Sequence, residues 1–302
     1  MPPRRDSLRR FQALAAAAVL LASSAPVHAE ELKQPTIDAF DRYVKIREAQ
    51  IEQDLRNKDG FLWVDRLPEP RRAQAFAHLK DGVEEKKGQR SYVKIERLRV
   101  LDENGKPIEA PDALIHHWIG TVFVPGATLL QAMALVQDYD RHHVNYAPDV
   151  ADSKTLQRTG NDFKIYMRFK KKRFVTIVLD TWQDVHYLPQ GAARMHSRAY
   201  STRIQEVEDD GTPHQKLKPV GDDRGFMWRL YTYWHFDERD GGVYIQCEAI
   251  TLSRDVPLIL KWLKEWITKE ARNSLTATLG RSRDVLLGKY PPPTIRAAHP
   301  AN

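Results

Sequence analysis

Cysteine is nearly absent from this chain of 302 residues, which contains only Cys247. A single cysteine cannot form an internal disulfide, so stability must come from a hydrophobic core, and a chain of this length can build one. The glycine patterns of phosphate- and dinucleotide-binding loops are also missing, as is the G-x-S-x-G motif of a serine nucleophile. The sequence therefore lacks the local signatures of the commonest nucleotide-binding proteins and serine hydrolases.

Positively charged residues exceed negatively charged residues only slightly. The formal net charge of +7 falls to +4 when the first 29 residues are left out, which is too little to predict a nucleic-acid partner. Metal ligands are scarce as well. His116 and His117 are neighbours in a predicted strand and face opposite ways. His142 and His143 lie at a predicted helix end near Asp138 and Asp140, which is a conceivable metal corner, but zinc sites usually show a tighter spacing of ligands, and a loop at the mouth of a pocket is the favoured role. We expect no nucleic acid, no metal and no cofactor.

Long hydrophobic runs are limited to one, from about Phe11 to Ala22. It is shorter than the roughly 20 residues that a membrane-spanning helix needs. Arginines precede it within residues 4–10, and small residues ending at Ala29 follow it, which is the order of a secretory signal peptide. We expect cleavage near Ala29 and a periplasmic or secreted mature protein.

Along the remaining chain, segments with the hydrophobic spacing of a helix are followed by segments with the alternation of a strand. Helical spacing predicts helices over 35–55, 70–81 and 127–143, and Asn104-Gly105 predicts a hairpin turn. Strand patterns follow at 113–124, 162–169, 173–182, 193–207, 225–236 and 242–252, and Pro257 opens a last helix that ends near Leu287. Successive strands joined by short turns favour an antiparallel sheet that the last helix covers on one face.

The turn Asp240-Gly241 sets the register around Cys247. If Arg239 pairs with Gly242, Trp234 lies opposite Cys247, and paired side chains share one face of the sheet. That face carries Leu230, Thr232, Trp234, Phe236, Val243, Ile245, Cys247 and Ala249. Its apolar character predicts that Cys247 is a small wall residue, since the alternative, a reactive thiol, requires cationic neighbours.

The opposite face of the same hairpin is polar. It carries Tyr231, Tyr233, His235, Tyr244, Gln246 and Glu248. A histidine and a carboxylate on adjacent strands could carry out acid–base chemistry. We favour a simpler interpretation, a solvent-facing sheet surface stabilised by aromatic cross-strand pairs.

Two further segments carry apolar residues at the spacing of one face. The strand at 162–169 places Phe163, Ile165, Met167 and Phe169 together, and it ends in a cationic tip at 170–173 that could touch acidic lipid headgroups. In the last helix, Trp262 and Trp266 are one turn apart and fall on or beside an apolar stripe.

This arrangement resembles the helix-grip fold of the START and polyketide-cyclase-like superfamily. The likeness is carried by "WIGTVFVPGATLLQAMALVQDYDRHHVNYAPDV" at 118–150 and by "SRDVPLILKWLKEWITKEARNSLTATLGRSRDVL" at 253–286. It implies an α+β fold in which a curved antiparallel sheet wraps around a long C-terminal helix and encloses a cavity for a lipid or other apolar molecule. It implies no catalytic residues, because the superfamily shares no catalytic set.

We therefore divide the chain into a signal peptide (1–29), a helical N-terminal extension (30–83), a START-like helix-grip domain (84–290) and a tail (291–302). The expected function is binding of a hydrophobic small molecule between the sheet and the last helix, with transient contact to a membrane surface. The predicted ligand-binding residues are Phe163, Ile165, Met167, Leu230, Trp234, Ile245, Cys247, Ala249, Trp262 and Trp266. The alternatives are a cyclase- or hydrolase-type enzyme that uses the same cavity, and a protein-interaction module that acts through the N-terminal helices.

Overall fold

A computed structural model describes residues 32–57, 60–172, 176–220, 223–255 and 261–289. The predicted signal peptide, the tail after residue 289 and Pro257 lie outside these ranges. No helix within the described residues is long and apolar enough to span a membrane.

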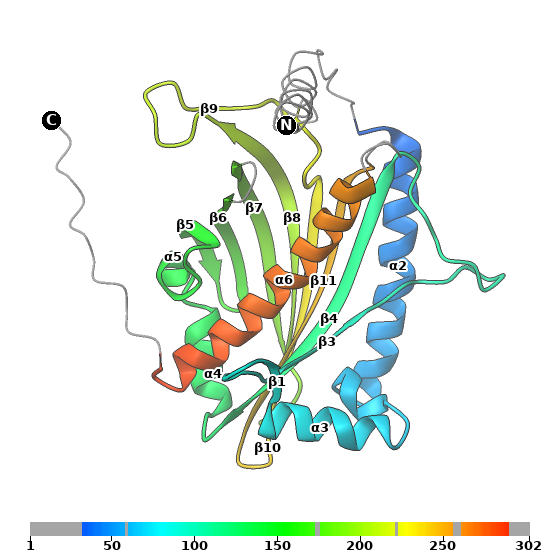
Figure 1. The fold of residues 1–302 in the computed structure, drawn as a ribbon, viewed down its shortest axis with the longest axis vertical. Coiled ribbons are helices and arrows are strands. Elements are labelled where there is room, and N and C mark those ends of the chain that lie inside the picture. Colours follow the sequence, from blue (N-terminus) through cyan, green and yellow to red (C-terminus); the bar gives the residue numbers. More distant parts are fainter. Residues whose placement is uncertain (1–31, 58–59, 173–175, 221–222, 256–260, 290–302) are drawn as a thin grey trace, which may run out of the picture.

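A large antiparallel sheet forms the body of the molecule (Figure 1). Its strands follow the order β3 (Val93–Arg97), β4 (Ala113–Pro125), β11 (Gly242–Arg254), β10 (Arg229–Arg239), β8 (Arg194–Glu208), β7 (Thr176–Pro189), β6 (Asp162–Lys172) and β5 (Val150–Thr159), and the short β9 (Lys216–Leu217) pairs with β8. A separate hairpin is formed by β1 (Val83–Lys86) and β2 (Gln89–Ser91). Every strand pair is antiparallel, as the hairpin spacing predicts.

The long helix α6 (Lys261–Leu286) crosses the concave face of the sheet (Figure 1). It packs mainly against β4, where Gly120 permits a close approach, because a Cβ at this position would lie 2.7 Å from Cδ1 of Leu279. The curved sheet gripping this helix is the α+β helix-grip fold, so the expected fold class is confirmed.

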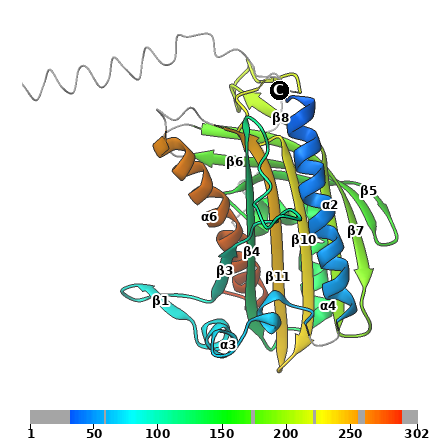
Figure 2. The ribbon, with the colours of Figure 1, turned by 90° about the vertical axis from the view of Figure 1, so that its right-hand side faces the viewer.

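The helix α2 (Gln34–Arg56) lies against the opposite, convex face of the sheet (Figure 2). Its buried residues Phe40, Tyr43 and Ile51 pack in one cluster with Tyr233 and Ile250 of the sheet. The polar face of the last hairpin is therefore covered, and our interpretation of it as solvent-facing is wrong. The sequence periodicity of the strands identifies the two faces but does not show which distant element packs on them.

The expected helix over 127–143 is divided into three pieces, α4 (Leu129–Val136), η2 (Tyr139–Arg141) and α5 (His142–Asn145). The capping box of Thr128 and Gln131 begins α4 as a regular helix. The break near Asp138 turns Tyr139 toward β7, where its hydroxyl meets that of Tyr187 at 2.7 Å. Tertiary contacts thus override the local helical pattern.

The prediction of the N-terminal helices and the prediction of a hairpin at Asn104-Gly105 have different outcomes. The helices α2 and α3 (Arg71–Asp81) form where they are predicted, and η1 (Trp63–Arg66) lies between them. The turn at Asn104-Gly105 forms with Gly105 at φ 75°, but its flanks make only the single bridge Leu101–Pro107. The predicted hairpin is therefore a tight turn within a loop and not a pair of strands.

The register predicted for the last hairpin is confirmed. Arg239 pairs with Gly242, Phe236 with Ile245, Trp234 with Cys247, Thr232 with Ala249 and Leu230 with Thr251. Because the turn Asp240-Gly241 adopts positive φ at both residues, 57° and 72°, it joins the strands in the register that a two-residue loop requires.

Candidate functional site: a cavity between the sheet and the C-terminal helix

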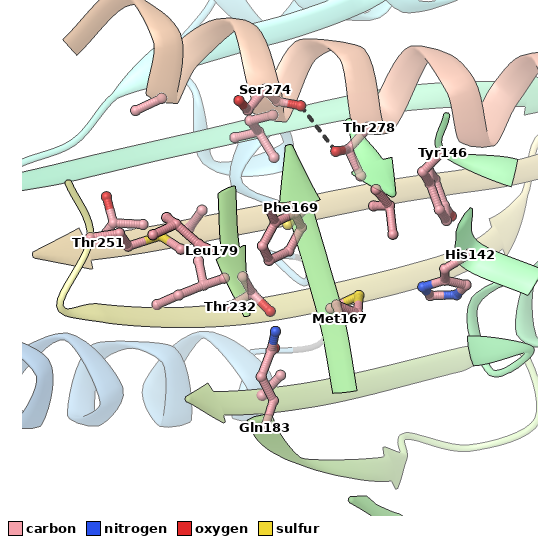
Figure 3. Close-up of a pocket in the computed structure, with 18 of the residues that line it drawn as sticks. His142, Tyr146, Met167, Phe169, Leu179, Gln183, Thr232, Thr251, Ser274 and Thr278 are labelled. Carbon is pink, nitrogen blue, oxygen red and sulfur yellow. Dashed lines mark hydrogen bonds between the residues drawn. The ribbon is translucent and has the colours of Figure 1, made fainter. Parts of the chain in front are cut away.

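A cavity of about 320 Å³ lies between the concave face of the sheet and α6 (Figure 3). Small-molecule sites typically enclose roughly 300–1,000 Å³, so this cavity is at the lower end of that range. Its walls come from β4, β5, β6, β7, β8, β10 and β11, from α6, and from the segment of α4, η2 and α5. Strands and helices, and not exposed loops alone, hold most of the lining side chains in place.

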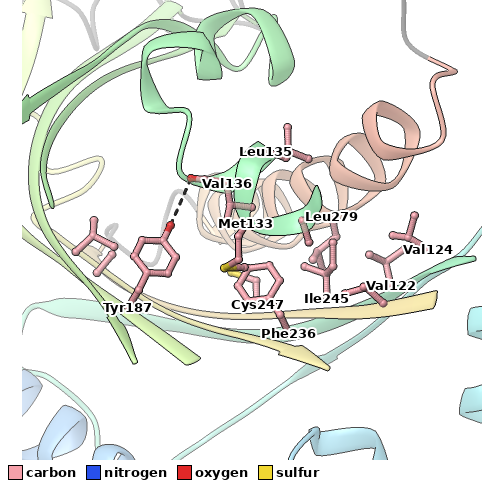
Figure 4. Close-up of a cluster of buried hydrophobic side chains, with 14 of the residues drawn as sticks. Val122, Val124, Met133, Leu135, Val136, Tyr187, Phe236, Ile245, Cys247 and Leu279 are labelled. Atoms are coloured by element: carbon pink, nitrogen blue, oxygen red, sulfur yellow. Dashed lines mark hydrogen bonds between the residues drawn. The ribbon is translucent and has the colours of Figure 1, made fainter. Parts of the chain in front are cut away.

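Six of the ten predicted ligand-binding residues line this cavity: Ile165, Met167, Leu230, Trp234, Cys247 and Ala249. Phe163 and Ile245 are buried in the adjoining hydrophobic cluster instead, and Figure 4 shows Ile245 there. The side chains of Trp262 and Trp266, both in α6, lie outside the described part of the structure.

One end of the cavity is closed by aromatic side chains that carry polar atoms. Tyr139, His142 and Tyr146 come from the segment after α4, and Tyr187 comes from β7. The hydroxyl of Tyr139 lies 2.7 Å from that of Tyr187, which donates in turn to the carbonyl of Val136 at 3.4 Å (Figure 4). At this end of the cavity, the hydrogen-bonding groups are therefore paired within the protein.

Two more contacts complete this closed end. Ser282 Oγ donates to the carbonyl of Thr278, so the hydroxyl of Tyr146, 3.1 Å from Ser282 Oγ, is the donor in that pair. Nε2 of His142 lies 3.1 Å from the carbonyl of Val136. Figure 3 shows His142 and Tyr146 together at this end.

Burial keeps these groups uncharged. It raises the pKa of Tyr146 to about 12, raises the pKa of Tyr139 and of Tyr187, and lowers the pKa of His142 to about 4. At neutral pH the closed end therefore presents neutral phenols and a neutral imidazole.

The opposite end of the cavity is more accessible. Phe169, Lys171, Met227 and Ile267 line it and are each partly exposed. Among the described lining residues, Lys171 and Glu270 are the only lysine, arginine, aspartate or glutamate side chains, and Nζ of Lys171 is bound to Asp149 at 2.5 Å. The wall that the structure describes is thus apolar and nearly free of charge.

Cys247 is buried in the apolar wall, as its strand face predicts. Burial, with a smaller contribution from the Glu248 carboxylate, raises the pKa of this thiol well above its ordinary value. A protonated thiol is a poor nucleophile, which supports the interpretation of Cys247 as a packing residue.

Glu248 points to the other face of the sheet and belongs to a buried network beneath α2. Its carboxylate accepts hydrogen bonds from Arg47 at 2.6 and 2.8 Å and lies 2.7 Å from Nε2 of His117. Nδ1 of His117 lies 2.8 Å from the hydroxyl of Tyr43. The side chain of Glu248 is fully buried. The network attaches α2 to the sheet, because Arg47 and Tyr43 belong to α2, and it does not face the cavity.

Several lining residues are not among those predicted from the sequence. Gln183, Val185 and Tyr187 alternate along β7, and this period of two was the available signal for a shared face. Tyr139 and His142 had no such signal, because the pattern predicted an unbroken helix. Within the described residues, no group of three or more potential metal ligands comes together.

The fold and the cavity define the class of structure as an α+β helix-grip domain that encloses a mainly apolar chamber. No protein-family model matches the sequence, and no curated protein sequence does.

Similar solved structures include a fragment of a STAR-related lipid transfer protein from Xanthomonas axonopodis, with 17% identity, a TM-score of 0.43, and coverage of 59% of this chain and 96% of that one. Another is human STARD10, with 12% identity, a TM-score of 0.41, and coverage of 74% and 83%. The Zhui aromatase/cyclase from a Streptomyces species is similar with 9% identity, a TM-score of 0.40, and coverage of 58% and 96%. At these identities the likeness concerns the fold alone.

Proposed function

We propose that this protein binds a lipid or other hydrophobic small molecule in the cavity between the sheet and α6. The observation that carries the proposal is a cavity of about 320 Å³ inside the fold, bounded mainly by apolar side chains. Burial of a ligand's apolar surface contributes about 25 cal/mol per Å², so such a wall supplies affinity without charged contacts.

The test enlarges one wall residue. Ala249 lines the cavity between Trp118 of β4 and Thr232 of β10, its two strand partners. We expect Ala249→Phe to fill space that the ligand needs, so the protein keeps its melting temperature but loses binding of an apolar probe followed by tryptophan fluorescence. Trp118 and Trp234 line the cavity and report on the probe.

Ala132→Phe is the matched control. Ala132 of α4 is fully buried in the packed cluster beside the cavity, where added volume typically costs about 1–3 kcal/mol. We expect this variant to lower the melting temperature. If Ala249→Phe destabilises the protein to the same extent and the parent binds no apolar probe, the cavity is not a binding site.

We also propose that the protein acts outside the inner membrane after removal of the first 29 residues. The support is the order of arginines, apolar run and small residues that ends at Ala29. N-terminal sequencing of the protein from its native host is expected to start at Glu30 or within a few residues of it, and a chain that starts at Met1 would contradict export.

A further inference from the structure

The wall of the cavity contains a buried hydrogen-bond donor that has no acceptor. Trp118 of β4 lines the cavity, and within the described part of the chain its Nε1 makes no hydrogen bond. An indole nitrogen donates one proton and accepts none, and the N–H of a buried tryptophan usually has an acceptor. An unpaired donor is unfavourable, so an acceptor that a ligand brings to this indole would stabilise the complex.

A second nitrogen donor points into the same space. The amide of Gln183 in β7 lies 3.1 Å from Oγ1 of Thr181. That hydroxyl donates its one proton to the carbonyl of Met167 at 3.0 Å, so the amide atom beside it is the nitrogen. Figure 3 shows this nitrogen directed toward Thr232. Nε2 carries two protons, and among the described residues only the one bound to Thr181 has an acceptor.

Of these two groups, Trp118 gains more from an acceptor. Its indole has a single proton and that proton is unpaired, whereas one of the two amide protons of Gln183 is already bound. Trp118 and Thr232 lie on either side of Ala249 of β11, so the indole belongs to the middle of the cavity. The tyrosine hydroxyls of the closed end donate to partners within the protein and offer no such proton.

We infer that Trp118 determines the specificity of the cavity, because its N–H donates to a carbonyl oxygen of the ligand, such as that of a ketone or an ester. The position of the indole in the middle of the wall places this carbonyl within the apolar part of the ligand and not at the closed end. This assignment rests on the proposed binding function and adds the residue that distinguishes one apolar ligand from another.

The experiment compares two probes of the same shape, methyl heptyl ketone and the alkene in which a methylene group replaces its oxygen. Only the ketone offers a strong hydrogen-bond acceptor. Dissociation constants are measured by displacement of phenylnaphthylamine, a neutral fluorescent probe. Because the ketone and the alkene differ in solubility, the quantity compared is the change of each dissociation constant between the parent protein and a variant.

Trp118→Phe removes the N–H and keeps an aromatic ring in the wall. We expect it to weaken binding of the ketone about five- to tenfold, as the loss of one hydrogen bond allows, and to change binding of the alkene less than about twofold. Trp182→Phe is the matched control, because Trp182 does not line the cavity and its ring lies 3.5 Å from the guanidinium carbon of Arg203. This control is expected to leave both dissociation constants unchanged.

The indole N–H resonance of Trp118 gives a direct readout in the parent protein, which decides the question if Trp118→Phe does not fold. We expect this resonance to move downfield in the nitrogen–proton NMR spectrum when the ketone is added, and to show no such shift with the alkene. An indole that only packs against the ligand would respond in the same way to both probes, because they have the same shape.

The outcomes separate the two proposals. If phenylnaphthylamine, the ketone and the alkene all fail to bind the folded parent protein, the binding function itself fails. If the probes bind, but Trp118→Phe affects the ketone and the alkene equally, the cavity is a binding site and the role of Trp118 is overturned. A selective loss of ketone binding in Gln183→Met, and not in Trp118→Phe, also overturns it, because the carbonyl would then pair with the amide.

Discussion

At the scale of single residues, Cys247 and Glu248 show how one strand serves two environments. The cysteine lies in the apolar wall of the cavity, and the glutamate lies in a buried ion-pair network on the other face. Neighbouring side chains of a strand point to opposite faces, so adjacency in sequence places them apart. Cys247 and Glu248 therefore lead to separate predictions, one on thiol reactivity and one on stability.

The raised pKa of Cys247 predicts an unreactive thiol. We expect almost no alkylation by iodoacetamide at pH 8 in the folded protein and full alkylation in urea. Cys247→Ser places a hydroxyl in an apolar wall, which typically costs about 1–3 kcal/mol of stability, while probe binding remains. Rapid modification of the folded protein would show that the thiol is chemically active.

Glu248→Gln is expected to lower the free energy of unfolding by about 3–5 kcal/mol, because it removes the carboxylate that buried Arg47 contacts at 2.6 Å and leaves only Asp54, at 3.8 Å, as an ionic partner. Glu103→Gln, which breaks the exposed pair with Arg42, is the matched control and is expected to cost at most about 1 kcal/mol. Urea denaturation measures both, and equal effects would contradict a stabilising role for the buried network.

The lowered pKa of Glu248 predicts that the protein loses stability in acid. Burial opposes ionisation of Glu248, but its hydrogen bonds and charge interactions with Arg47 and His117 lower its pKa well below the ordinary value. Its stabilisation is present above the unfolded pKa, roughly 4.3, and is lost as pH falls below it. The Gln variant should therefore lose less stability than the parent below about pH 4.

At the scale of elements, the position of α6 over the sheet decides whether a cavity exists. The helix packs closely on β4 at Gly120, while the curved sheet continues away from it through β10, β8 and β7. The segment of α4, η2 and α5 closes one end of the remaining space. Contact at one edge of the sheet and curvature beyond it thus produce the chamber.

Replacing either of two glycines at this contact by alanine is expected to change the stability of the protein in opposite directions. A methyl group at Gly120 would lie 2.7 Å from the buried Leu279 side chain, so Gly120→Ala is expected to displace α6 and cost about 1–3 kcal/mol. In Gly280→Ala the new Cβ comes no closer than 3.9 Å to Val93, and alanine stabilises a helix interior by roughly 0.5–1 kcal/mol. Thermal melting of both variants checks the contrast, and a stabilised Gly120→Ala would contradict it.

At the scale of the whole molecule, buried histidines lie on both faces of the sheet. Desolvation lowers the pKa of His142, at the cavity, and of His196, beneath α2, to about 4. For His196 the nearby Arg198 adds to the effect. The folded protein therefore holds these imidazoles in the neutral form.

This burial predicts a loss of stability in mild acid. Below pH 6.5 the unfolded chain binds protons at these histidines and the folded chain does not, so the free energy of unfolding falls as pH decreases from 6.5 toward 4. We expect urea denaturation between pH 7 and 5 to show this slope, and His142→Gln to reduce it by up to one proton. A pH-independent stability over this range would refute the assignment.

The sequence by itself determined the faces of the strands, the register of the last hairpin and the nature of the cavity wall. These features depend on the period of two and on one turn, Asp240-Gly241, which are local and can be read without knowing the neighbours. For this reason six of the predicted ligand-binding residues lie on the cavity wall, and Cys247 is correctly placed as a buried apolar residue.

Only the tertiary structure decided what covers each face and where the space remains. Arg47 and Glu248 are far apart in the chain, and no local pattern connects a helix near the N-terminus to the last strand. The break after α4 likewise depends on a contact with β7. A cavity is the volume that packed elements leave unfilled, so its size follows from their distances in space and not from the order of residues.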